Sequence, residues 1–95
     1  MTKLKANNVF SALGFEEEEA LNLTLRAHLM MELSSIIDDN GWSLREAASH
    51  FGVAHPRISD IKQGRIDRLS LDYLVGLLTK VGKTVTMVVK DVEAS

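Results

Sequence analysis

The side chains with the strongest potential for chemistry are concentrated between residues 41 and 68. This stretch holds five basic and three acidic side chains, whereas residues 1–40 hold three basic and seven acidic ones. Guanidinium and ammonium groups bind phosphate, and a guanidinium can also bond two acceptors on the edge of a guanine. Although the net charge of the chain is −2, its positive charge therefore lies where it could meet a nucleic acid.

The apolar spacing within this stretch predicts two short helices joined by a tight turn. Ser43 is a good N-cap for the first helix, which ends at Gly52, where glycine allows a positive φ. The second helix begins near Ala54 and turns Ile58 and Ile61 towards the first. The apolar residues of the first helix are Leu44, Ala47, Ala48 and Phe51. Two such helices leave the polar side chains of the second one available for a ligand.

We expect these polar side chains to divide between base edges and phosphates. Arg57 is the first choice for base readout, while Asp60 would accept from a cytosine amino group or orient Arg57 through a salt bridge. Pro56 lies in the first turn, where its missing N–H costs nothing, and its ring could touch a thymine methyl group. The predicted base-reading residues are His55, Pro56, Arg57 and Asp60. The predicted contacts to the DNA backbone are Ser43, Arg45, Ser59, Lys62, Arg65 and Arg68.

The motif resembles the helix-turn-helix of the Cro/C1 repressor class, also called the XRE class, and within it the HigA-type antitoxin branch. The likeness to the class rests on Ala47 and Ala48, the turn at 51–53, Ile58, and the ending at 61–64. The likeness to the antitoxin branch rests on residues 55–61 and 64–72, with Val9, Phe10 and 13–15 upstream. The resemblance implies a mainly α, lambda-repressor-like domain of five helices that binds double-stranded operator DNA as a transcriptional repressor.

The resemblance also implies a protein partner. HigA-type antitoxins bind a HigB-type ribonuclease toxin, and the complex represses its own operon in a type II toxin-antitoxin module. We therefore expect a HigB-like toxin to sit against the acidic first 40 residues. The alternative is a stand-alone XRE-family regulator without a toxin. In either case Ala54 occupies a position where the family usually carries a capping Ser or Thr.

Composition argues against an enzyme and against a membrane protein. The chain has no cysteine, and Glu46 and His50 share a helical face without further ligands, so we expect no catalytic residues, no metal site and no cofactor. No apolar run approaches the roughly 20 residues that span a bilayer. We expect a cytoplasmic, nucleoid-associated protein.

The chain as a whole divides into an arm at 1–15, a helical domain at 16–82 that includes the motif, and a terminal segment at 83–95. Apolar stripes predict one helix that starts at the glutamates 16–19 and another that Ser70 caps. Residues 83–90 are instead rich in β-branched side chains, which indicates a strand. A lone strand needs a partner, so we expect a twofold dimer with Val85, Met87 and Val89 on the pairing strand. Pairing with a strand of a different protein is the alternative.

Overall fold

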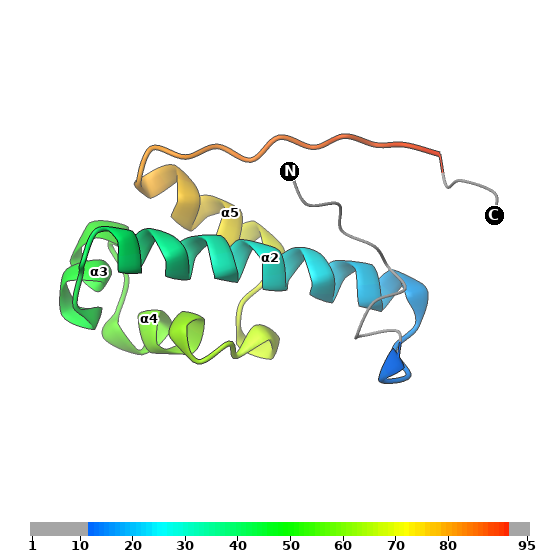
Figure 1. The fold of residues 1–95 in the computed structure, drawn as a ribbon, viewed down its shortest axis with the longest axis horizontal. Helices are drawn as coiled ribbons and strands as arrows, with labels where there is room; N and C mark the ends of the chain where they lie inside the picture. Colours follow the sequence, from blue (N-terminus) through cyan, green and yellow to red (C-terminus); the bar gives the residue numbers. More distant parts are fainter. Residues whose placement is uncertain (1–11, 92–95) are drawn as a thin grey trace.

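The computed structural model describes residues 12–91 and shows a helical fold organised along one long helix (Figure 1). This helix, α2 (Glu17–Asp39), contacts α4 (His55–Lys62), the short 3-10 turn η1 (Ile66–Arg68) and α5 (Leu71–Lys80). The remaining helix, α3 (Leu44–Phe51), contacts α4 and α5. No helix in this part of the chain has both the length and the hydropathy needed to cross a bilayer. The predicted mainly helical fold is confirmed.

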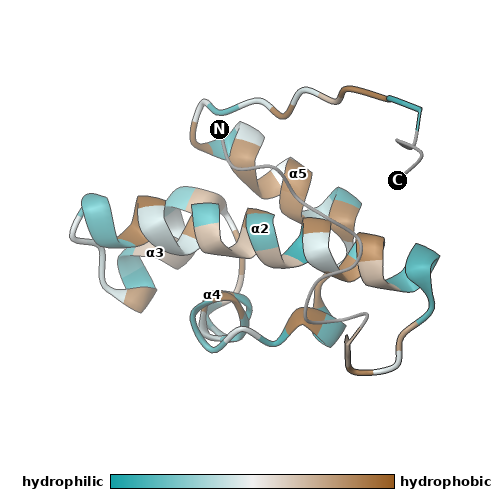
Figure 2. Cartoon of the chain, turned by 45° about the vertical axis from the view of Figure 1, so that its right-hand side comes forward, coloured by the Kyte–Doolittle hydropathy of each residue, from teal (hydrophilic) through white to brown (hydrophobic). Residues whose placement is uncertain are grey.

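Two architectural expectations are not shown within residues 12–91. The structure gives four complete α-helices over residues 17–80, and the count of five is not tested because residues 1–11 lie outside the described part of the chain; residues 83–91 form no strand. They leave α5 as an extended segment with hydrophobic stretches (Figures 1 and 2). A strand is defined by hydrogen bonds to a neighbouring strand, and a single chain offers none over these residues. Pairing with a second chain stays a prediction, and most of the expected arm at 1–15 lies outside the described residues.

One hydrophobic core joins the four α-helices of residues 17–80. Its largest fully buried side chains are Leu33, Ile37, Phe51, Ile58, Leu69 and Leu74. They come from each of the four α-helices and from the residue that follows η1. Fully burying a side chain of this size is worth about 1.5–3 kcal/mol, so the shared core sets the positions of α3 and α4 against α2.

The helices of the motif end in tight glycine turns. Gly52 (φ 67°) follows α3, and the next N–H, from Val53, donates to Ala48 O at 3.0 Å. Gly64 (φ 70°) follows α4 in the same way, with Arg65 N–H donating to Asp60 O at 2.9 Å. The left-handed glycine lets the chain reverse while it satisfies the last helical carbonyls. The predicted positive φ at Gly52 is confirmed, and the turn at Gly64 brings the basic residues after it back beside α4.

Candidate nucleic-acid interface

The start of α3 is held by its own side chains. Ser43 Oγ accepts from Glu46 N–H, and Glu46 Oε1 accepts from Ser43 N–H, both at 3.1 Å, which completes a capping box. The hydrogen bonds from Ser43 hold the pKa of Glu46 below its usual value. Ser43 therefore serves first as a cap of α3. Arg45, in the same turn, is exposed and stays a predicted phosphate contact.

The start of α4 is open. Ala54 has an extended backbone (φ −71°, ψ 147°) and provides no side-chain hydrogen bond to the first turn. His55 and Pro56 follow it, and both side chains are exposed. The buried Ile58 and Ile61 hold α4 against the core from its other face. Two of the four predicted base-reading residues thus lie on the free surface at the helix start.

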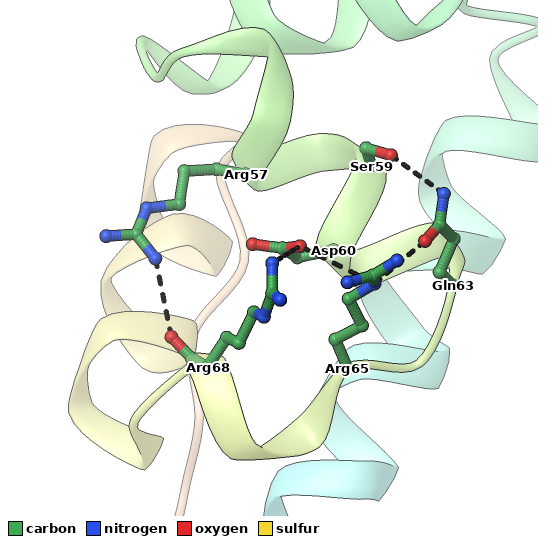
Figure 3. A network of polar contacts seen from close by, with 6 residues as sticks. All are labelled: Arg57, Ser59, Asp60, Gln63, Arg65 and Arg68. Carbon is green, nitrogen blue, oxygen red and sulfur yellow. Dashed lines mark hydrogen bonds and ion pairs between the residues drawn. The ribbon is translucent and has the colours of Figure 1, made fainter.

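Asp60 lies in a different environment from the one predicted. It is only 8% exposed, and its Oδ1 lies 3.4 Å from Arg68 Nη1 and 3.9 Å from Arg65 Nε (Figure 3). These contacts close the loop after α4 onto the helix. The alternative salt bridge with Arg57 is not the one that forms. Asp60 therefore orients the two arginines that follow α4, because its carboxylate is engaged by them.

Arg57 is exposed but turned towards α5 instead of lying free beside His55. Its Nη1 donates to the backbone carbonyl of Arg68 at 3.3 Å, and its guanidinium carbon lies 5.5 Å from the centre of the Tyr73 ring. Figure 3 shows the side chain reaching across to the η1 segment. A guanidinium over an aromatic face gains a cation–π attraction. The structure thus places Arg57 with Arg68 and Tyr73.

The remaining predicted backbone contacts divide into two groups. Lys62 is tied to α2, since its Nζ lies 2.6 Å from Asp38 Oδ1 and 2.9 Å from Ser34 Oγ. Ser59 Oγ accepts from Gln63 Nε2 at 3.0 Å, and Gln63 Oε1 accepts from Arg65 Nε at 2.8 Å (Figure 3). This chain of contacts holds Arg65 along the end of α4. Gln63 joins the network although its position in the sequence did not single it out.

A second residue that sequence reasoning missed is Arg26 of α2. Its Nη1 donates to Ile66 O at 3.0 Å, 40 residues away in the chain. Together with Arg57, Arg68 and Tyr73 it lines a cavity of about 330 Å³ beside η1. A signal was present, because Arg26 stands three residues after Leu23 and four before Met30, both of which are buried. An arginine on a buried helical face needs polar partners from elsewhere in the fold.

His50, which shares a face with Glu46, makes an aromatic contact. Its ring stacks on Trp42 with centroids 3.9 Å apart and an angle of 12° between the planes. Between residues 12 and 91 no group of three or more His, Asp or Glu side chains is arranged to hold a metal ion.

Comparison with known proteins agrees with this geometry. The sequence model of a family described as a helix-turn-helix domain matches residues 9–90, which is most of the chain. No curated protein matches the chain. The family match covers the two motif helices, the core that holds them and the extended segment after α5. The chain therefore belongs to this helix-turn-helix domain family and is a DNA-binding protein of the helix-turn-helix kind.

Proposed function

We propose that the protein is a sequence-specific transcriptional repressor that inserts the start of α4 into the major groove of operator DNA. The observation that carries the proposal is the exposed, uncapped first turn of α4, with His55 and Pro56 on the surface. Arg57 on α4, and Arg65 and Arg68 after it, add positive charge to the same part of the molecule (Figure 3). In helix-turn-helix proteins the first residues of the second motif helix reach base edges. The arginines supply the phosphate attraction that orients such a helix.

We further propose that two copies bind together through the extended segment after α5. In this segment Met87 is 79% exposed and Val89 is 93% exposed, although both are hydrophobic. Val85 is partly buried against the core, so it anchors the segment to its own domain. Pairing two such segments would satisfy their backbone groups and cover their apolar side chains. It would also place the α4 helices of the two copies against the two half-sites of a palindromic operator.

We propose further that the protein is an antitoxin that also binds a toxin protein. The alternative is a stand-alone regulator without a toxin partner. The exposed start of α2 carries Glu17, Glu18 and Glu19, with Leu21 beside them at 43% exposure. A surface that combines carboxylates with an exposed leucine fits a basic protein partner such as a HigB-like toxin. Co-purification of the chain with the product of a neighbouring short, basic reading frame would favour the antitoxin. A chain that binds its operator with no such neighbour would favour the stand-alone regulator.

The test of the main proposal is DNA binding by fluorescence anisotropy with two forms of the protein. One is the full chain, and the other ends after Thr86, which keeps the anchored Val85. We expect the full chain to bind DNA from upstream of its own gene, or a site selected from a random library, more tightly than scrambled DNA. The binding should weaken steeply between about 50 and 200 mM salt.

The shortened chain should sediment as a monomer, keep its thermal stability, and bind the same site more weakly. Equal, weak binding of the full chain to selected and scrambled DNA would contradict the proposed function. A full chain that sediments as a monomer would contradict the dimer alone.

A further inference from the structure

Arg57 belongs to α4, the helix that we propose enters the major groove, but its guanidinium lies against η1 and α5. It is the third residue of α4, yet its guanidinium is held by the backbone carbonyl of Arg68 and the face of Tyr73, at 3.3 Å and 5.5 Å. Both partners lie after α4 in the chain, at η1 and on α5. In this structure Arg57 therefore points towards η1 and α5 (Figure 3).

Beside η1, three arginines from three elements line one open pocket. Arg26 of α2, Arg57 of α4 and Arg68 of η1 line a volume of about 330 Å³. Asp67 is the carboxylate on the same lining, while Asp60 already lies within 4 Å of both Arg65 and Arg68. The lining therefore carries three positive charges and one negative charge. Because Asp60 pairs with Arg68, the positive charge of the lining that is open to a further anion is that of Arg26 and Arg57.

Arg26 reaches the same lining from α2. Its Nη1 donates to Ile66 O at 3.0 Å, which fixes the guanidinium of α2 against η1. A guanidinium presents its donors as a planar fork that matches two phosphate oxygens. The chemistry of the lining is thus that of a phosphate site.

We propose that Arg57, with Arg26 and Arg68, grips a phosphate of the DNA backbone in this cavity and does not read a base. The inference rests on the proposed function, because the phosphate belongs to the strand that passes the start of α4. In this proposal Arg57 strengthens binding to any DNA sequence. The choice of sequence at the start of α4 is made by His55 and Pro56. It also gives α2, which lies outside the two motif helices, a direct part in binding.

Arg57→Gln and Arg26→Gln test the proposal on a site selected from a random library and on scrambled DNA. Each variant should lose the same factor of affinity for both DNAs, so their ratio is unchanged. The slope of log K against log salt should become shallower by about 0.9 for each lost phosphate contact. Lys80→Gln, which removes an exposed charge in the last turn of α5, is the control and should leave the slope unchanged.

Several results would overturn the proposal. If Arg57→Gln weakens binding to the selected site alone, Arg57 reads a base. If both variants keep the affinity and the salt slope of the parent, the cavity holds no DNA phosphate, while the proposed function survives. Thermal unfolding shows whether the Arg26→Gln variant still folds. If that variant is unfolded, the DNA binding of Arg57→Gln, which changes an exposed residue, tests the proposal by itself.

A free anion is the other source of the same chemistry. Inorganic phosphate added to the protein should shift the Nε–H resonances of the cavity arginines in NMR spectra and weaken DNA binding by competition. Shifts without any competition would assign the cavity to a free anion and overturn the DNA assignment. A parent protein that binds no DNA at all would remove the proposed function and this inference together.

Discussion

The two helices of the motif are each eight residues long and pack on one another, but their first turns are built in opposite ways. α3 begins with a capping box between Ser43 and Glu46, which engages its own backbone donors. α4 begins at Ala54 with no side-chain cap, and the exposed His55 and Pro56 follow. α3 is therefore stabilised from its start, whereas α4 depends on the buried Ile58 and Ile61. The difference separates a helix that holds the motif from a helix that presents a surface.

The strongest test of this difference is removal of the aromatic anchor of α3. Phe51 is fully buried, so Phe51→Ala should lower the free energy of unfolding by about 3–5 kcal/mol. Urea denaturation followed by circular dichroism measures the loss. Met31→Ala on α2, where the side chain is 72% exposed, is the control and should change stability by less than about 0.5 kcal/mol. A small loss at Phe51 would mean that α3 does not anchor the motif.

A smaller effect is expected at the cap of α3. Ser43→Ala should cost about 1 kcal/mol, within the usual range of about 0.5–2 kcal/mol for a lost N-cap. Because the hydrogen bonds to Ser43 lower the pKa of Glu46 in the folded protein, the ionised Glu46 stabilises the fold at neutral pH. This contribution is lost as the pH falls below about 4.5, the ordinary value for this carboxyl.

The parent should therefore lose its advantage over Glu46→Gln as the solution is acidified, since the amide does not titrate. Thermal unfolding at a series of pH values measures this. An advantage that persists at acid pH would show that the charge of Glu46 does not act through the cap.

The smallest effect is expected at the start of α4. Ala54 already has the extended backbone of an N-cap residue and is exposed, so Ala54→Thr should add up to about 1 kcal/mol of stability by capping the first turn. Ala54→Val is the matched control, because it has the same shape without the hydroxyl and should add no cap. Equal stabilities of the Thr and Val variants would mean that the first turn of α4 has no need of a cap.

Local sequence signals predicted the parts of the motif that depend on neighbouring residues. Ser43 as a cap of α3, Gly52 as its left-handed end, and the burial of Ile58 and Ile61 are all found as expected. Each depends on spacing within one or two turns, which the sequence displays directly. The strand at 83–90 was predicted by the same kind of signal, but a strand also needs a neighbour. A strand at these residues would need a second chain as its neighbour, so the sequence of the segment alone does not determine whether it forms.

The sequence by itself determined where the helices of the motif start and end and which of their faces are buried. Only the tertiary structure decided what the charged side chains do. Asp60 meets Arg65 and Arg68, Lys62 meets Asp38, and Arg57 meets Tyr73. Caps and turns are local, so a short stretch of sequence encodes them. Long charged side chains pair with whichever opposite charges or aromatic rings lie near them in the folded protein. Those neighbours lie outside α4 and come close only when α2, η1 and α5 pack around the motif.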